Sequence, residues 1–162
     1  MLRTRKILSQ KMIGSIDDET VFREVCLDVS ESLKVDLVSI WYCSDGGGGI
    51  ECQCRYDALD GAFSKGQKLM KTDCQFYFET MVEYNCISAP DVHSHPATKE
   101  LIEAYFKPNG ILSLLDFILH EDFKPIGVIC CENRRDHRYW NDNDKNYLRS
   151  LASLISHRFC TT

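Results

Sequence analysis

Residues 108–140 constrain the fold of this chain more than any other part of its sequence. Two apolar segments, Ile111–Leu119 and Ile126–Cys131, stand on either side of the short turn Glu121–Lys124. Short apolar runs bounded by a turn are typical of buried strands joined in a β-hairpin. After a loop, apolar residues recur at helical spacing as far as Phe159. The pattern therefore predicts a buried hairpin followed directly by a long amphipathic helix.

The rest of the chain alternates between helical and strand periodicity. Asp17 is a good N-cap for a helix that extends to about Leu33, and Asn141 with Asp144 resembles a capping pair for the last helix. Strand pairs separated by helices, with long helices at both ends, fit an antiparallel sheet layered with helices, so the expected fold class is α+β. The other expected helices are 74–84, capped by Asp73 or Thr72, and 98–106, and the other expected strands are 35–43, 50–56 and 86–89.

The chain is expected to be a single domain over residues 1–162, because this length is typical of one domain. Residues 1–14 are expected to form a leading helix that is apolar along one side and ends at a break at Gly14-Ser15. Residues 15–160 would then hold the core and the C-terminal helix.

Composition argues against several functional classes. The formal net charge of −5 argues against a nucleic-acid binder, which would present a basic face. No apolar run approaches the ~20 residues that span a bilayer, so no membrane insertion is expected. The basic N-terminus lacks the apolar core of a secretory signal. Nine cysteines, an odd number, fall inside apolar segments where a free cysteine packs as a small hydrophobe, so a cytoplasmic location is expected.

Two pairs of residues could supply soft metal ligands. They are Cys52 with Cys54 and His93 with His95, each pair separated by one residue. Zinc sites more often take two ligands about three residues apart from each of two segments. On a strand, a separation of two places both side chains on the same face, which for the two cysteines is expected to be the core. No metal site is therefore predicted.

Several residues near the hairpin have expected structural roles. Gly127 within a strand permits the close approach of a neighbouring backbone or bulky side chain. Gly110 permits the left-handed turn that ends a helix. Trp140 is expected to act as an apolar plug before the last helix, and Arg138 to pair with an acid such as Glu132.

A run of short motifs extends through most of the chain and includes Tyr77-Phe78-Glu79, Ala89-Pro90-Asp91, Thr98, Tyr105 to Ile111, Ser113 to Asp116, Gly127 to Glu132, Arg138 to Trp140, and Asp144. In this order and spacing, the run resembles the GAF domain, a small-molecule-sensing and dimerising module of signalling proteins. The resemblance covers roughly Asp17 to Phe159 and looks like the GAF domains placed ahead of histidine kinases and diguanylate cyclases. It implies a central antiparallel sheet of about six strands with helices packed on it and the terminal helices forming a bundle layer.

In GAF domains the sheet and the short helices over it enclose a ligand cavity. The resemblance makes Trp41, Asp91, Tyr105 and Asp116 the candidate ligand-binding residues in the wall of that cavity. Asp116 interrupts an apolar strand, so it either faces solvent at a sheet edge or is buried with a partner. In the alternative interpretation these residues are a structural carboxylate and ordinary core aromatics, and side chains fill the cavity.

The sequence does not identify a cofactor. Some GAF domains attach a bilin through a Cys next to a His, whereas Ser94 precedes His95 here, so attachment by that route is not expected. A haem bound by His93, His95 or His120 is left open, although a lone histidine is more often at the surface or structural.

One enzymatic branch of the family reduces free methionine sulfoxide with a reactive cysteine, for which the counterpart here is Cys74. Asp73 and Gln75 replace the glycines that would flank this cysteine, and the second cysteine expected between His95 and Ile111 is missing. A nucleophilic thiolate also needs a cationic or helix-N-terminal setting, which Cys74 could have. Catalysis is not expected, and this reductase is kept as the least favoured alternative.

The sequence therefore predicts a non-catalytic sensor in two-component or related signal transduction. It would bind an unidentified small molecule and relay the signal through its terminal helices to a kinase or cyclase output domain. Those helices, around Arg3–Ile13 and Asp144–Phe159, are expected to pair in a homodimer, because their apolar stripes exceed what one sheet face need cover. The competing prediction is a ligand-free dimerisation or protein-interaction module.

Overall fold

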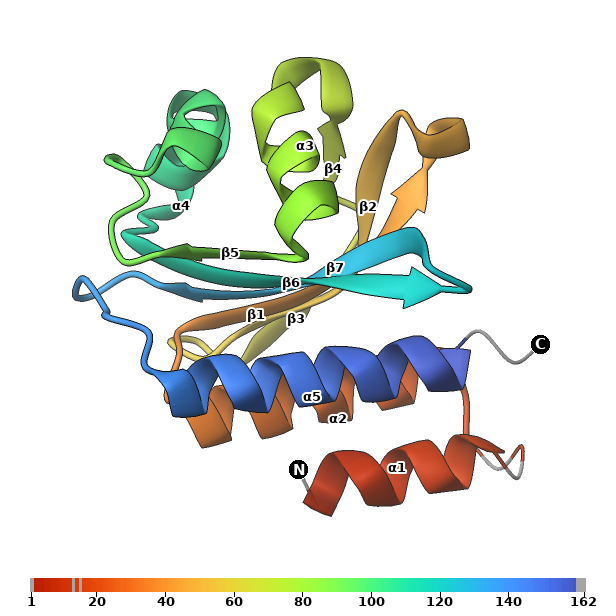
Figure 1. Ribbon diagram of the computed structural model, residues 1–162. Coiled ribbons are helices and arrows are strands. Elements are labelled where there is room, and N and C mark those ends of the chain that lie inside the picture. The colour runs from red at the N-terminus through yellow and green to blue at the C-terminus, as the bar shows by residue number, and fades with distance from the viewer. Residues whose placement is uncertain (1, 13, 15, 160–162) are drawn as a thin grey trace.

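A seven-stranded sheet lies at the centre of the molecule between two layers of helices (Figure 1). The computed structural model describes residues 2–12, 14 and 16–159. The strand order is β3-β2-β1-β7-β6-β5, with β4 paired to β2, and the pairings are antiparallel. The predicted α+β class and layered sheet are confirmed. The strands are β1 (Leu37–Ser44), β2 (Gly49–Asp57), β3 (Ala62–Ser64), β4 (Lys68–Met70), β5 (Cys86–Ala89), β6 (Ser113–Glu121) and β7 (Lys124–Asn133).

The layer below the sheet in Figure 1 consists of helices and includes both terminal helices of the described chain. Its helices are α1 (Leu2–Met12), α2 (Asp18–Leu33) and α5 (Asp142–Phe159). α2 and α5 lie side by side against the lower face of the sheet, and α1 packs on the outside of α2. The apolar stripes of α2 and α5 are buried in a core cluster with residues of β1, β2, β6 and β7. The predicted bundle layer of terminal helices is confirmed.

The capping residues that the sequence indicated set the ends of two of these helices. The Asp17 side chain accepts a hydrogen bond from the Thr20 amide at 2.8 Å. Asn141 and Asp144 form a reciprocal capping box, with donor–acceptor distances of 2.9 and 3.2 Å. Trp140, directly before that box, is buried in the lower core as predicted.

Arg138 pairs with an acid, as predicted, but its partner is Asp144 and not Glu132. The guanidinium of Arg138 lies over the Trp140 ring at 4.7 Å and donates to the Asp144 carboxylate at 3.2 Å. It also donates to the Leu33 carbonyl at the end of α2. Arg138 therefore ties α2 to α5 below the sheet, whereas Glu132 lines a pocket above it.

The upper layer begins with α3 (Gln75–Tyr84), which is capped by a residue distant in sequence. The cap expected from Thr72 or Asp73 is not formed. Instead, the Glu100 carboxylate accepts the amide hydrogens of the first two residues of the helix at 3.1 and 3.0 Å. A negative charge at this end of a helix is also favoured by the helix dipole.

The helix expected over 98–106 is a series of short turns with different winding. η3 (Pro96–Leu101) is a 3₁₀-helix, η4 (Ile102–Phe106) is a π-helix, and α4 (Lys107–Asn109) is a single α-helical turn. α4 ends at Gly110, whose φ of 66° is the left-handed conformation predicted for it. A π turn is rare and occurs frequently at functional sites. Of two further 3₁₀ turns, η1 (Asp45–Gly47) connects β1 to β2 and η2 (Lys71–Asp73) connects β4 to α3.

β6 and β7 form the predicted hairpin at the centre of the sheet. Its two turn residues, Asp122 and Phe123, both have positive φ, as a type I′ turn requires. Gly127 of β7 lies against β1 so closely that a Cβ atom there would stand 1.9 Å from the Trp41 carbonyl oxygen. The predicted close approach at Gly127 is confirmed.

A bulge in β2 separates Cys52 from Cys54. Ile40 pairs with Cys54 and the next residue, Trp41, pairs with Cys52, so Gln53 is an extra residue in the strand. Cys52 belongs to the upper core cluster and Cys54 to the lower one. The prediction that both cysteines share one face is therefore wrong.

Two short strands and some of the expected element ends differ from the expectation or lie outside the described residues. β3 and β4 were not predicted, because each has only three residues. Ile13, Ser15 and Cys160, which lie at the expected ends of the leading helix and of the core, are outside the described residues. The single-domain extent 1–162 stays a prediction. Within the described part of the chain, no helix has the length and apolar character needed to cross a bilayer.

The Gly127→Ala variant is expected to be destabilised by about 3 kcal/mol, because the new methyl group would overlap the β1 backbone. Urea denaturation measures the change in the free energy of unfolding. Gly48→Ala is the control, since its Cβ would meet its nearest atom at 3.2 Å and its cost is expected to be smaller. Equal costs for the two variants would contradict the close packing of β1 on β7.

Candidate functional site

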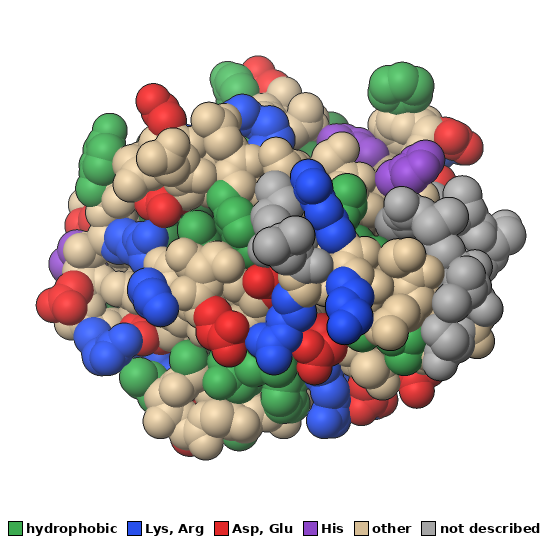
Figure 2. Space-filling view, turned by 90° about the horizontal axis from the view of Figure 1, so that it is seen from below, with side chains coloured by type: hydrophobic (Ala, Val, Ile, Leu, Met, Phe, Trp, Pro, Cys, Tyr) green, Lys and Arg blue, Asp and Glu red, His purple; other side chains and the backbone are tan. Residues whose placement is uncertain are grey.

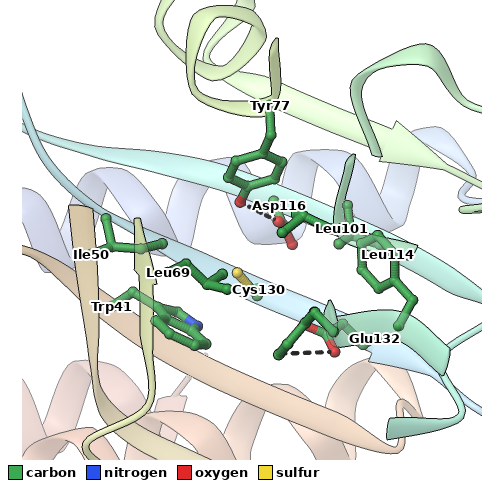
Figure 3. Close-up of a pocket in the computed structure, with 11 residues that line it drawn as sticks. Trp41, Ile50, Leu69, Tyr77, Leu101, Leu114, Asp116, Cys130 and Glu132 are labelled. Carbon is green, nitrogen blue, oxygen red and sulfur yellow. Dashed lines mark hydrogen bonds between the residues drawn. The ribbon is translucent and has the colours of Figure 1, made fainter. Parts of the chain in front are cut away.

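A small pocket lies between the upper face of the sheet and the layer that holds α3 and η4 (Figure 3). Its volume is about 10 Å³, which is room for about one water molecule. Apolar side chains form most of its wall, and two carboxyl groups stand among them. The lining residues are Trp41, Ile50, Leu69, Tyr77, Leu101, Tyr105, Phe106, Leu114, Asp116, Cys130 and Glu132.

The register of the central hairpin brings the polar residues of the pocket together. Asp116 of β6 is directly opposite Cys130 of β7, and Leu114 is opposite Glu132. Residues two apart on a strand share a face, so the two carboxyl groups are diagonal neighbours on the upper face. Helices cover this part of the sheet on both sides, and Asp116 and Glu132 are 1% and 2% exposed.

The Asp116 carboxyl group is held by a tyrosine of α3. The Tyr77 hydroxyl donates to Asp116 Oδ2 at 2.6 Å, as Figure 3 shows. The other oxygen, Oδ1, is buried and has no hydrogen-bond partner of standard geometry among the described residues, although the Cys130 thiol lies beside it. Burial, and then the charge of Glu132, raise the pKa of Asp116 well above its usual value.

The Glu132 carboxyl group is held in a similar way by a tyrosine of η4. The Tyr105 hydroxyl donates to Glu132 Oε1 at 3.0 Å. Burial raises the pKa of Glu132 to about 7, although the nearby charge of Arg55 favours the ionised form. Burial also raises the pKa values of Tyr77 and Tyr105, so both phenols stay protonated and act as donors.

Three of the four residues predicted for the cavity wall lie around this pocket. Trp41 and Tyr105 meet edge to face with ring centroids 6.3 Å apart, and Asp116 stands on the sheet beneath α3. Asp91 is not in the wall. It lies in an exposed turn, where its carboxylate accepts from the His93 amide at 2.9 Å and the Ser94 hydroxyl at 2.6 Å.

Sequence reasoning missed Tyr77, Cys130 and Glu132 as parts of the pocket. Glu132 carries a signal that could have revealed it, because it continues the alternation of Val128 and Cys130 on one strand face. That face is the one that holds Asp116. Tyr77 gives no comparable signal, since its contact with Asp116 depends on how α3 crosses the sheet.

The histidines considered as haem or metal ligands lie away from the pocket lining. His95 Nδ1 accepts a hydrogen bond from the Ala97 amide at 3.1 Å, so its imidazole caps η3. Partial burial lowers the pKa of His95, which keeps this nitrogen free to accept. His93 and His120 are not among the lining residues either. In the described part of the chain, no three His, Cys, Asp or Glu side chains are grouped to hold a metal ion.

Cys74, the candidate nucleophile of the reductase alternative, is fully buried. Its thiol donates to the Met70 carbonyl at 3.3 Å. Burial, with the charges of Glu100 and Asp73, raises the pKa of Cys74 to about 12. At neutral pH it is therefore a thiol and not the thiolate that nucleophilic attack needs.

Comparison with protein families agrees with this architecture. The family model described as "GAF domain" matches residues 17–159. The chain belongs to the GAF family. No curated protein sequence is similar enough to this GAF domain to count as a match.

Solved GAF structures share its fold at low sequence identity. The phycocyanobilin-bound GAF domain of a cyanobacterial phytochrome is 12% identical, with a TM-score of 0.79 over 97% of this chain and 92% of that one. The GAF domain of PixJ from Thermosynechococcus elongatus, in a blue-light absorbing form, is 15% identical, with a TM-score of 0.75 over 88% and 84%. The GAF domain of an Acinetobacter phosphoenolpyruvate-protein phosphotransferase is 15% identical, with a TM-score of 0.71 over 96% and 90%.

The buried Glu132 predicts a stability that falls as the pH rises. Its pKa is about 7 in the fold and 4.5 for an exposed glutamate side chain, so between these values the folded chain holds a proton that the unfolded chain has lost. The free energy of unfolding is therefore expected to fall over this range, by about 3 kcal/mol from Glu132 alone. Urea denaturation at several pH values measures it.

The control for this pH dependence is Glu132→Gln, which carries no charge at any pH. Its stability is expected to fall less over the same range, with Asp116 still contributing in the same direction. An equal fall in the two proteins would contradict the assignment to Glu132.

Proposed function

We propose that this GAF domain is a non-catalytic sensor that binds a small molecule in the pocket between the sheet and the α3–η4 layer. The observation that carries the proposal is the pair of carboxyl groups buried there, one of which has an oxygen without a partner of standard geometry among the described residues. Burying a carboxyl group costs stability unless it is fully hydrogen-bonded. A ligand that completes the hydrogen bonds would recover part of this cost.

The chemistry of the pocket favours a ligand that donates hydrogen bonds. Both carboxyl groups can accept, and Asp116 Oδ1 has accepting capacity that Tyr77 does not use. The apolar wall around them fits a small group with little other polarity. An ammonium group is the best match, because a hydrogen bond from a cation to a carboxylate is stronger than one between neutral groups.

The size of the pocket implies that binding moves the upper layer. A volume of about 10 Å³ admits a water-sized group, so a larger ligand would require α3 or η4 to move away from the sheet. Tyr77 and Tyr105 hold these two segments to the carboxyl groups. A ligand that competes for Asp116 would weaken one of those links and favour the more open arrangement.

The output is proposed to pass through α1 and α5 to a kinase or cyclase domain. The two helices lie in the same layer, and α5 packs directly on β6, which carries Asp116.

We also propose that this layer forms a homodimer. Because the stripes of α2 and α5 are covered within one chain, the contact would use the outer face of the layer, where Figure 2 shows charged side chains of both signs with scattered hydrophobic ones.

The cytoplasm is the proposed location, because the eight cysteines that the structure describes are free and a reducing compartment keeps them so. Two thiols support the non-catalytic assignment. Cys74 is the counterpart of the reductase cysteine and Cys130 lines the pocket, and the pKa values of both are raised.

A second candidate function is a protein-interaction module without a ligand. The observation that favours it is the same small volume, since side chains fill nearly all of the space above the sheet. In that case the Asp116–Tyr77 and Glu132–Tyr105 bonds would serve only to fasten the upper layer.

A thermal-shift panel separates the two candidates. Methylammonium, guanidinium and small primary amines are expected to raise the melting temperature, whereas formate and acetate at equal ionic strength are not. A ligand at 100 times its Kd adds about 2.7 kcal/mol to the free energy of unfolding. A flat response to the whole panel would favour the interaction module, and a response to the anions alone would contradict the proposed ligand chemistry.

Matched variants locate the site. Asp116→Asn is expected to abolish the response to amines, and Asp91→Asn, the same change outside the pocket, is expected to preserve it. A response that survives in Asp116→Asn would place the ligand elsewhere.

Native mass spectra of the same samples report the number of subunits, and a monomer at every concentration would contradict the homodimer.

A further inference from the structure

A second cleft opens on the other face of the sheet, between the start of α2 and the edge formed by β2 and β3. Its volume is about 130 Å³, which is space for several water-sized molecules. It is separate from the pocket under α3, since the two share no lining residue. The cleft is lined by Glu19, Arg23, Gln53, Cys54, Phe63, Ser64 and Lys65.

The bulge at Gln53 places the Cys54 thiol in this cleft. Without the extra residue, Cys54 would share the upper face with Cys52. On the lower face it joins the core cluster that holds Cys26 of α2, and the two thiols lie beside each other. Two thiols from α2 and β2 therefore lie close together, and Cys54, although only 3% exposed, lines the cleft.

Two cationic side chains line the same cleft as this thiol. The Arg23 guanidinium lies over the Phe63 ring at 4.9 Å, and the Lys65 ammonium is 2.9 Å from the Glu19 carboxylate. Glu19 also pairs with Arg23 at 3.0 Å, so two cations and one anion surround the opening. The surplus positive charge favours an anion at the bottom of the cleft.

Cys54 is unusual among the described cysteines. The neighbouring Cys26 thiol, and then the charges of Arg23 and Lys65, lower its pKa, although burial and the charge of Glu19 act in the opposite direction. The pKa values of the other seven described cysteines are raised by burial. Cys43 is more accessible than Cys54, but partial burial of its thiol raises its pKa.

We propose that Cys54 is a peroxide-reactive thiol and that Cys26 is its resolving partner. The Cys54 thiolate attacks one peroxide oxygen, an S–O bond forms, the O–O bond breaks, and the leaving oxygen takes a proton to give water or an alcohol. Cys54 is then a sulfenic acid, oxidised by two electrons at the expense of the peroxide. Cys26 attacks that sulfur, an S–S bond forms, and the hydroxyl leaves as water with the Cys26 proton.

The product would join α2 to β2 covalently. α2 belongs to the layer of terminal helices, so an oxidant would act on the layer through which the proposed output passes, and from a site other than the ligand pocket. This inference is independent of the pocket under α3, because neither cysteine lines it.

The test is oxidation of the reduced full chain with a small molar excess of hydrogen peroxide, followed by intact mass and peptide mapping. The expected product has lost two hydrogen atoms and contains one cross-linked peptide pair, Cys26 with Cys54. A map in which Cys43 is the first residue oxidised, with no link between Cys26 and Cys54, would overturn the proposal.

Variants test the two roles separately. Cys26→Ser is expected to trap the Cys54 sulfenic acid, which dimedone labels, and Cys54→Ser is expected to leave Cys26 reduced. Cys43→Ser is the control and is expected to form the cross-link at the wild-type rate. Arg23→Gln is expected to slow the reaction at Cys54, and circular dichroism checks that each variant is folded. If Cys26 of the Cys54→Ser protein were oxidised as fast as the wild type forms its cross-link, Cys54 would not be the attacking thiol.

Discussion

Coverage of the central strands on both faces is the constraint on which the rest of this structure depends. β1, β7 and β6 carry α2 and α5 below and the α3–η4 layer above, so side chains on both faces of these strands enter a core. Apolar residues satisfy this arrangement without cost. Asp116 and Glu132 are costly to bury, because they are polar and the strand register directs both side chains into the upper core. Their pKa values are raised because the fold leaves them little solvent.

The two carboxyl groups connect the sheet to the layer above it. Tyr77 joins Asp116 to α3, and Tyr105 joins Glu132 to η4. The strands below are fixed by the contact of Gly127 with β1, whereas η4 has the wide winding of a π-helix. A ligand or a proton that changes the carboxyl groups would therefore act first on the helices, because the sheet has no room to yield. This asymmetry makes the upper layer the natural place for a sensed signal to begin.

Much of the architecture could be predicted because it depends on local pattern. The hairpin, the Asp17 cap and the Asn141–Asp144 box follow from residues close together in sequence. The differences come from contacts that the local sequence pattern does not specify. Glu100 caps α3 from another turn, and Asp91 closes its own turn instead of facing the pocket. The bulge at Gln53 has no sequence signal as strong as a glycine, yet it decides which core receives Cys54. Trp41, Tyr105 and Asp116 line the pocket as expected, and that they bind a ligand stays a prediction.

The buried carboxyl groups are proposed to serve ligand recognition at a cost to stability. The most direct measurement is the free energy of unfolding of the double variant Asp116→Asn/Glu132→Gln near pH 8, compared with the wild type. Both amides can still accept from the tyrosines but remove the cost of burying ionised groups, so the account predicts a variant at least as stable as the wild type. A variant destabilised by about 2 kcal/mol or more would contradict it, because a loss of that size is typical of a structural hydrogen-bond network.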